Sequence, residues 1–366
     1  MQNIKSIVGR NLTNALGWRT NRKIIVIESD DWGSIRVPDK KAINYLRSKG
    51  FAVDKCPYVM NDALESNEDL EILFEFIESR KKKPIITSNF LTANPSFKKI
   101  KESNFEKYYF ENLEMTLNQY PNHDKVKKLW LEGTKNEYFS PQLHGREHLN
   151  ISQWMGDLKR GNYETREAFK LGMFGISAHI VKVKRNSYQA ALGIQKGEEV
   201  DFSQVLKDAF DEFEKLFGFK SRTFIAPNYT WDEKIEKITA NLGITHLQGV
   251  SAQRIPKLIG DKPRIKRNFL GESNRYGQKY LIRNVSFEPF MNPNLDWVSC
   301  AMIEIRNAFF WNKPAIISMH RVNFIGSINE NNRSQNLKLF NELLDKIDEY
   351  WPDVEFLSSK DLAKLI

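Results

Sequence analysis

Seven short apolar runs recur along this chain, and segments with helical spacing separate them. The runs cover residues 23–29, 84–88, 137–140, 222–226, 243–247, 314–318 and 353–357. Each run has the length of a buried strand, and several are rich in β-branched residues. Strands that alternate with helices predict a parallel sheet with helical crossovers, and this number of strands favours a single α/β barrel.

The barrel domain is predicted to cover residues 23–366, because no Gly/Ser-rich or Pro-rich linker divides this range. Segments of about 92–135 and 155–205 are too long for simple connections, so we interpret them as helical or irregular insertions. Residues 1–22 carry an apolar stripe at helical spacing, made of Ile4, Ile7, Val8, Leu12 and Leu16. The stripe predicts an amphipathic helix packed on the barrel, and peripheral membrane contact through residues 1–20 is the alternative.

Composition excludes several classes of protein. Of the 366 residues, 41% are hydrophobic, which is enough for a large core. The two cysteines, Cys56 and Cys300, cannot build a disulfide scaffold or a CxxC zinc site. No apolar run approaches the roughly 18 residues of a membrane span, and the N-terminus lacks the pattern of a secretory signal. We therefore expect a cytoplasmic protein, with a membrane-peripheral location as the variant.

The chain is moderately basic. Its 55 Lys and Arg residues exceed its 46 Asp and Glu residues, which gives a net charge of +9. Basic clusters such as residues 262–267 could attract an anionic partner or serve only solubility. The basic residues are interleaved with acidic ones and form no known nucleic-acid-binding motif, so no nucleic acid partner is expected.

Polar residues suited to catalysis follow three of the predicted strands. Asp30-Asp31 follows the first, His144 and His148 follow the third at an H-x3-H spacing, and His320 follows the strand at 314–318. In parallel α/β folds, active sites assemble at the carboxyl ends of strands. One Asp could bind a metal while the other acts as a base, because adjacent strand residues point in different directions. An Asp-rich turn and packed histidines are the structural alternatives.

Taken in chain order, these residues resemble the motifs of the polysaccharide deacetylase family, also known as NodB-homology or carbohydrate esterase family 4 proteins. Glu28-Ser29-Asp30-Asp31-Trp32 is similar to the Thr-Phe-Asp-Asp-Gly motif, and residues 144–148 are similar to His-Ser/Thr-x-x-His. Residues 222–227 resemble Arg-x-Phe-Arg-x-Pro. Asp296-Trp297 resembles the Asp-Trp motif, and Ser318-Met319-His320 resembles Leu-x-His. The resemblance spans residues 23–366.

The resemblance implies a distorted (β/α)7 barrel and a divalent metal, zinc in the first place, with cobalt, nickel or manganese as alternatives. The implied metal ligands are Asp31, His144 and His148, which leave a coordination position open for water and a substrate carbonyl. Asp30 would be the general base, His320 the general acid, and the backbone N–H of Asn228 a donor to the oxyanion. The residues assigned to substrate binding are Trp32, Tyr229, Arg222 and Trp297.

Three departures from the family pattern concern the site. Gly145 stands where the family has Ser or Thr, so a hydroxyl that supports the histidine pair is missing. Ile225 stands where a second Arg balances the charge of the base, so Asp30 is expected to lack a partner and to have a raised pKa. Trp32 replaces a Gly, which would narrow the site or offer a face on which a sugar stacks. These changes indicate a divergent branch or an inactive relative.

The sequence thus predicts a metal-dependent hydrolase that removes an N-acetyl group, or in second place an O-acetyl group, from a carbohydrate. A biosynthetic intermediate of a surface polysaccharide, linked to a nucleotide or a lipid, would suit the expected compartment and the basic charge. Three alternatives stay open. They are a non-catalytic glycan- or anion-binding relative, a metallopeptidase in which His144-x-x-Glu147-His148 uses Glu147 as base, and a barrel glycosidase with paired carboxylates.

Overall fold

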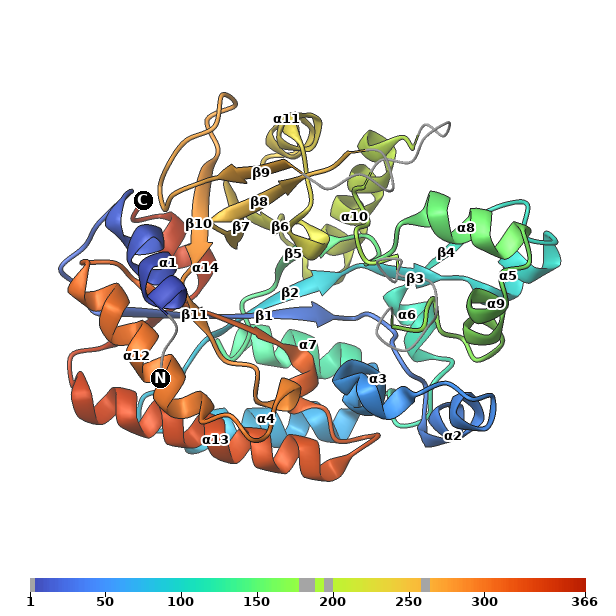
Figure 1. Ribbon diagram of the computed structural model, residues 1–366, viewed down its shortest axis with the longest axis horizontal. Coiled ribbons are helices and arrows are strands. Elements are labelled where there is room, and N and C mark those ends of the chain that lie inside the picture. Colours follow the sequence, from blue (N-terminus) through green and yellow to red (C-terminus); the bar gives the residue numbers. More distant parts are fainter. Residues whose placement is uncertain (1–3, 178–187, 194–199, 258–263) are drawn as a thin grey trace.

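Parallel strands form a nearly closed barrel, seen from the side in Figure 1. The computed structural model describes residues 4–177, 188–193, 200–257 and 264–366. The strands follow the spatial order β10-β7-β6-β5-β2-β1-β12-β11, every neighbouring pair is parallel, and β13 pairs with β1 off this path. Their bounds are β1 Ile24–Trp32, β2 Ile86–Leu91, β5 Gln142–Gly145, β6 Thr223–Ile225, β7 His246–Val250, β10 Lys279–Arg283, β11 Val285–Ser286, β12 Ala315–His320 and β13 Glu355–Leu357. The predicted α/β barrel is confirmed, with 8 strands in the barrel wall.

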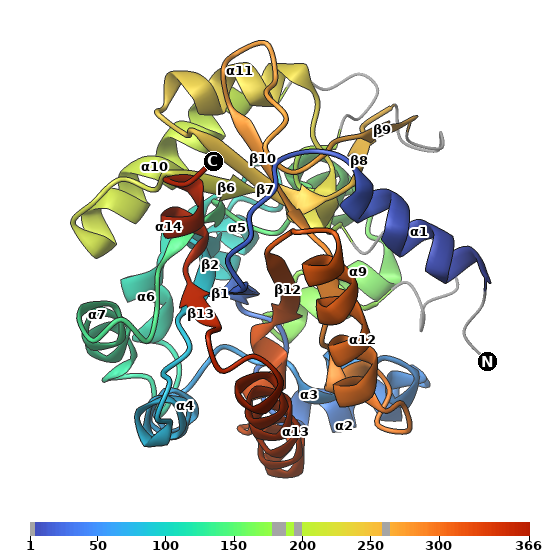
Figure 2. The same ribbon diagram turned by 90° about the vertical axis from the view of Figure 1, so that its left-hand side faces the viewer.

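Helices surround the strands, as the view along the barrel in Figure 2 shows. They are α1 Ile4–Ala15, α2 Lys40–Ser48, α3 Pro57–Asn61, α4 Asn67–Ser79, α5 Phe97–Glu102, α6 Leu113–Leu117, α7 Val126–Lys135, α8 Ile151–Lys159, α9 Tyr163–Lys170, α10 Phe202–Phe217, α11 Glu233–Asn241, α12 Trp297–Phe310, α13 Glu330–Tyr350 and α14 Ser359–Ala363. In Figure 1, α4, α7 and α13 lie below β1, whereas α10 and α11 lie above the sheet. The core lies between these layers and the strands, and residues Ile24, Ile25, Val26 and Ile27 of β1 are fully buried in it.

Two differences from the predicted strands bear on the site. The predicted strand at 137–140 is wrong, because Phe139 makes only an isolated bridge to Ile86 and the barrel strand is β5, a few residues later. The backbone turns at Glu137, where φ is 60°, and the aromatic ring of Phe139 packs edge-on against Phe74. Strand β10 was not predicted, because only three apolar residues stand between Lys279 and Arg283.

The N-terminal helix α1 lies against α12. Asn14 Nδ2 donates to Asn307 Oδ1 at 2.8 Å, and Lys313 Nζ donates to the backbone carbonyls of Leu16, Gly17 and Trp18 at 2.6–2.8 Å. The first three residues of the predicted helical segment lie outside the described part of the chain. The division into a helix at 1–22 and a single domain at 23–366 stays a prediction.

The two predicted insertions contain regular structure. Within 92–135 lie the antiparallel pair β3 Ala93–Pro95 and β4 Phe110–Asn112, together with α5, α6 and α7. Within 155–205 lie the end of α8, all of α9 and the start of α10, whereas residues 178–187 and 194–199 are outside the described residues. A second antiparallel pair joins β8 Ala252–Ile255 to β9 Arg264–Arg267. In the part of the chain that the structure describes, each helix is too short or too polar to cross a membrane.

Candidate active site

Asp31, His144 and His148 converge at the carboxyl ends of β1 and β5. One ligand atom from each residue lies within 4.8 Å of the other two, and all three side chains are buried. Asp31 Oδ1 is 3.5 Å from His144 Nε2 and 3.9 Å from His148 Nε2. Atoms that each bind a tetrahedral zinc at about 2.0–2.1 Å lie roughly 3.3 Å apart. The spacing of the triad therefore suits a small divalent cation.

A bulge at the end of β1 brings both aspartates to this site. The pairing of β1 with β2 shifts register between Ser29 and Trp32, and Asp31 takes a positive φ of 73°. This backbone conformation is uncommon outside glycine and often marks a functional site. In a regular strand, Asp30 and Asp31 would face opposite sides. Here both carboxylates interact electrostatically with His144 and His320.

The polar atoms of the triad fit a bound metal. Asp31 Oδ1 is buried and has no hydrogen-bond partner among the described residues, which costs free energy unless a cation or donor faces it. His144 Nδ1 lies 2.9 Å from the backbone carbonyl of Ile225 and must donate to it, since a carbonyl only accepts. The lone pair of His144 Nε2 then faces Asp31, as ligation requires. Arg36 Nη2 donates to Asp31 Oδ2 at 2.7 Å and leaves Oδ1 as the ligand atom.

The charge states of the triad suit a metal as well. Burial alone raises the pKa of Asp31, but the adjacent His144 imidazole and the charge of Arg36 outweigh it and hold this pKa well below its ordinary value. Burial lowers the pKa of His148 to about 3, with Asp31 opposing the shift. Metal ligands must be deprotonated, so an ionised Asp31 and a neutral His148 are the required states.

Arg283 holds Asp30 from the neighbouring side of the barrel. Its Nη2 donates to Asp30 Oδ1 and its Nη1 to Asp30 Oδ2, both at 2.7 Å, while its Nε donates to Glu28 Oε2 at 2.5 Å. Burial alone raises the pKa of Asp30, but the charge and hydrogen bonds of Arg283 reverse this and lower it. The expectation of an unpartnered Asp30 with a raised pKa is therefore wrong. An arginine from β10 occupies the place that Ile225 leaves vacant.

His320 pairs with Glu288 and, among the described residues, makes no hydrogen bond or ion pair with Asp296 of the motif at Asp296-Trp297. His320 Nδ1 is 2.5 Å from Glu288 Oε1. Burial alone lowers the pKa of His320, but the charge and hydrogen bond of Glu288 outweigh it and raise the pKa to about 9. Asp296 instead caps α12 by accepting a hydrogen bond from the Ser299 N–H. His320 pairs in register with Asp30 across β12 and β1, so the two candidate proton-transfer groups lie side by side.

A tight turn carries Asn228 and Tyr229 to the same end of the barrel. Residues Pro227–Tyr229 form a 3₁₀ turn, in which Asn228 and Tyr229 have φ values of 55° and 53°. Within the described residues, no acceptor takes the backbone N–H of Asn228, so this donor is available to a ligand. The Tyr229 hydroxyl accepts a hydrogen bond from Arg283 Nη1 at 3.0 Å. Tyr229 therefore supports Arg283, which is a different contact from the substrate binding assigned to it.

Two of the residues assigned to substrate binding lie away from the site. Trp32 is 1% exposed, packs between Phe139 and Phe324, and cannot stack on a sugar. Because Trp32 follows the bulge, its indole turns into the core. Arg222 precedes β6 and lies at the amino end of that strand, opposite the site. Trp297 begins α12, and its indole N–H donates to the Asn292 carbonyl. The substrate-binding assignment of Trp297 stays a prediction.

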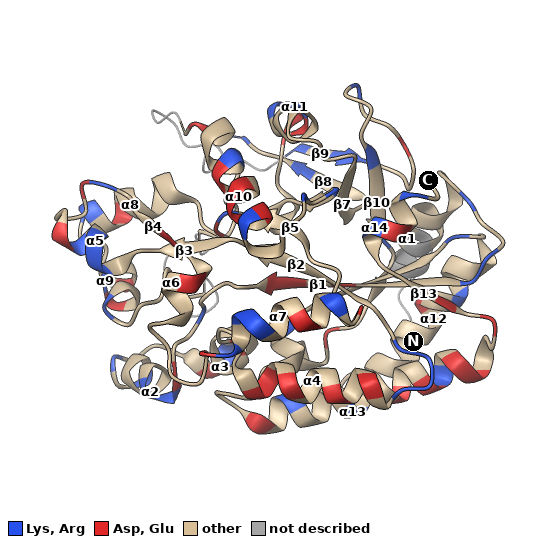
Figure 3. Ribbon diagram, turned by 180° about the vertical axis from the view of Figure 1, so that it is seen from behind, with Lys and Arg blue, Asp and Glu red and all other residues tan. Residues whose placement is uncertain are grey.

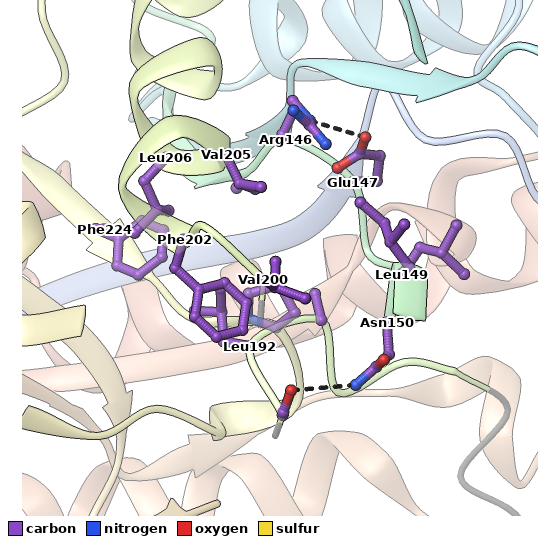
Figure 4. Close-up of a pocket in the computed structure, with 15 residues that line it drawn as sticks. Arg146, Glu147, Leu149, Asn150, Leu192, Val200, Phe202, Val205, Leu206 and Phe224 are labelled. Atoms are coloured by element: carbon purple, nitrogen blue, oxygen red, sulfur yellow. Dashed lines mark hydrogen bonds and ion pairs between the residues drawn. The ribbon is translucent and has the colours of Figure 1, made fainter. Parts of the chain in front are cut away.

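Glu147 does not have the setting of a peptidase base. His144 lies in β5, and residues 145–150 are not helical, whereas the H-x-x-E-H motif requires one helix. Glu147 Oε1 accepts hydrogen bonds from the Tyr108 hydroxyl at 2.6 Å and from Arg146 Nε at 2.8 Å. Glu147 also lines the pocket shown in Figure 4, which is mostly apolar and contains none of the three triad residues. The peptidase alternative loses its structural basis.

The functional residues that the sequence reasoning missed are Arg283, Glu288 and Arg36. No motif marks them. Arg283 and Glu288 contact Asp30 and His320 across the tertiary fold. Arg36 reaches Asp31 from five residues away, beyond the motif that contains Asp31. The one available signal was Ile225, which stands where the family pattern has a second arginine. A missing arginine beside a retained Asp30 implies that another cation replaces it, and β10 supplies that cation.

Comparisons with known proteins add little beyond the fold. No family model matches the sequence, and no curated protein matches it. A protein from Mycobacterium smegmatis that is provisionally named a polysaccharide deacetylase is 8% identical, with a TM-score of 0.44 over 96% of this chain and 93% of that chain. A CE4 family pseudoenzyme from Bacillus anthracis is 10% identical, with a TM-score of 0.35 over 89% of this chain and 62% of that chain. A GH57-type branching enzyme from Pyrococcus horikoshii is 8% identical, with a TM-score of 0.48 over 94% of this chain and 70% of that chain. Because these similarities are weak, function has to be argued from the site.

Proposed function

We propose that this chain is a divergent polysaccharide deacetylase, a metal-dependent hydrolase that removes an acetyl group from a carbohydrate. An N-acetyl group is the first choice of substrate and an O-acetyl group the second. Zinc is the metal that best suits the two imidazoles and one carboxylate. The observation that carries the proposal is the buried Asp31, His144 and His148 triad, in which Asp31 Oδ1 lacks a hydrogen-bond partner among the described residues.

Asp31, His144 and His148 would hold the cation, which when bound polarises a substrate carbonyl and lowers the pKa of water. Asp30 would accept a proton from the attacking water, and its hydrogen bonds with Arg283 would hold its carboxylate in one orientation. The Asn228 N–H can donate to the carbonyl oxygen as negative charge develops there. His320 is protonated at neutral pH and can give its Nε2 proton to the leaving nitrogen or oxygen.

The test is metal content and acetate release in matched variants. Purified wild type should hold about one zinc per chain, and Asp31→Asn and His144→Ala should lose it. His246→Ala is the control, because His246 is a buried histidine at the amino end of β7, remote from the triad. Acetate release from N-acetylated chito-oligosaccharides and from O-acetylated xylo-oligosaccharides would be measured for all four proteins.

The outcomes separate the alternatives. Metal bound by the wild type and by His246→Ala, with acetate release that requires the triad, supports the proposal. Stoichiometric metal without hydrolysis of either substrate would favour a non-catalytic glycan-binding relative. Activity that survives complete metal removal would favour a glycosidase or another metal-free mechanism, and would refute the proposal.

A further inference from the structure

The antiparallel pair of β8 and β9 carries exposed arginines that have no acidic partner among the described residues. Strands β8 and β9 form an antiparallel pair, here named the basic hairpin, in which Arg254 lies opposite Ile265 and Ala252 opposite Arg267. Directly opposed residues share one face, so Arg254, Ile265 and Arg267 point to the same side. All three side chains are exposed on this outer face. Figure 3 shows Lys and Arg residues on both strands and no acidic residue in either strand.

The inner face of the basic hairpin is anchored to the barrel. Gln253 is fully buried, and its Nε2 donates to the backbone carbonyl of Trp231 at 2.9 Å. Asn268 Nδ2 donates to Gln253 Oε1 at 2.8 Å, and Lys266 Nζ donates to the Tyr280 hydroxyl at 3.0 Å. These bonds fix which side faces outward, so the position of the outer arginines is set by the fold.

The outer arginines lack acidic partners. Within the described residues, neither Arg254 nor Arg267 makes an ion pair, and the same is true of Arg264 at the start of β9. Some exposed cations elsewhere do pair with carboxylates, as Arg47 does with Asp54 at 2.7 Å. Lys262 and Pro263, which belong to the basic cluster predicted from the sequence, lie outside the described residues.

The basic hairpin is connected to the candidate active site through Arg254. Arg254 Nη1 donates to Asn228 Oδ1 at 2.9 Å, and Arg254 forms a backbone bridge with Thr230. Asn228 is the residue whose backbone N–H is proposed to donate to the substrate carbonyl oxygen. Strand β8 starts two residues after the carboxyl end of β7, which is the end of the barrel where the site lies.

We propose that the outer face of the basic hairpin binds an anionic group, a phosphoryl or a carboxylate, carried by the carbohydrate next to its acetylated position. This inference rests on the proposed function and deepens it by naming the charge of the substrate. Guanidinium groups bind such anions through paired hydrogen bonds, and an arginine without a carboxylate partner is free to do so. The link from Arg254 to Asn228 places the anion beside the reacting group.

The test uses sugars without an acetyl group, so binding is measured without turnover. Glucose 1-phosphate, glucuronate and glucose would be titrated by calorimetry into wild type and into R254Q/R267Q. The control is K81Q/K135Q, which removes the same charge from two exposed lysines at the opposite end of the barrel, ahead of β2 and β5. Wild type and control should bind at least one charged sugar about tenfold more tightly than glucose, and R254Q/R267Q should lose that preference.

Comparison of the titrations with glucose 1-phosphate and with glucuronate shows whether a phosphoryl or a carboxylate group is preferred. Equal binding of charged and neutral sugars by wild type would overturn the inference, as would a preference that R254Q/R267Q retains. Stronger binding of a DNA duplex than of either charged sugar would also overturn it. The two proposals can fail separately. If the protein prefers charged sugars through the two arginines but releases no acetate, the proposed function is refuted and the anion site is not. Thermal melting of both double variants checks that they are folded.

Discussion

Replacement of Glu288 by Gln should make hydrolysis collapse on the alkaline side of neutrality. The substitution keeps the size of the side chain but removes the charge that faces His320 Nδ1 at 2.5 Å. Burial then lowers the pKa of His320 without the opposing effect of the Glu288 charge. We expect the pKa to fall from about 9 to the ordinary value of a histidine, about 6.5.

The expected magnitude follows from the fraction of His320 that carries a proton. With a pKa of about 9, roughly 90% of His320 is protonated at pH 8, whereas a pKa of about 6.5 leaves roughly 3%, so the rate at pH 8 should drop about 30-fold. At pH 6 most of His320 is protonated in both proteins, so the rates should differ by less than about twofold. Protonated His320 acts as an acid, so its contribution to the rate is present below its pKa and is lost as the pH rises through that value.

The assay is the pH profile of kcat for acetate release from an N-acetylated chito-oligosaccharide. Asp296→Asn is the matched control, because Asp296 is the carboxylate of the sequence motif but only caps α12. Its profile should match that of the wild type. A nitrophenyl acetate, whose leaving group departs without a proton, should be hydrolysed by Glu288→Gln at close to the wild-type rate across the range.

Two results would refute the reasoning. A loss of rate in Glu288→Gln that is equal at pH 6 and pH 8 would mean that Glu288 has a structural role only. A shifted alkaline limb in Asp296→Asn would mean that the pairing of Glu288 with His320 does not control the acid.

Further predictions concern stability and metal. Arg283→Met should lower the free energy of unfolding by about 3–5 kcal/mol in urea titrations, since it leaves two buried carboxylates unpaired, and a loss below about 1 kcal/mol would contradict the network. Chelation should lower the melting temperature of the wild type, because a metal at about 100 times its Kd contributes about 2.7 kcal/mol, and Asp31→Asn should show no such response. Glu147→Gln should retain metal and acetate release, and abolished release with metal retained would revive the peptidase reading. Lys313→Met should cost about 1–3 kcal/mol and make the segment around Leu16 cleavable by proteases, whereas unchanged cleavage would mean that the three capping bonds are dispensable.

Local patterns in the sequence were sufficient to predict the barrel, whereas the candidate ligands came from the resemblance to a family. Apolar β-branched runs such as Ile24–Ile27 can only be buried strands in a chain that alternates them with amphipathic helices. Polar residues directly after such runs, Asp30, Asp31 and His320, must then lie at the carboxyl ends of parallel strands. His144 and His148 were predicted at the same end of the barrel because they follow the third predicted strand. That strand was predicted a few residues too early.

Only the tertiary structure decided how these groups are paired. Arg283 reaches Asp30 across 253 residues of sequence, and Glu288 approaches His320 across 32, because the nearly closed barrel brings together segments that are distant in the chain. A local pattern describes which side of a strand is buried but carries no information on which charge lies opposite. The bulge that gives Asp31 a positive φ also turns the indole of Trp32 into the core, although its place in the motif had assigned Trp32 to substrate binding. The sequence by itself determined which residues could do chemistry, and the packing of strands decided which protonation state each of them has.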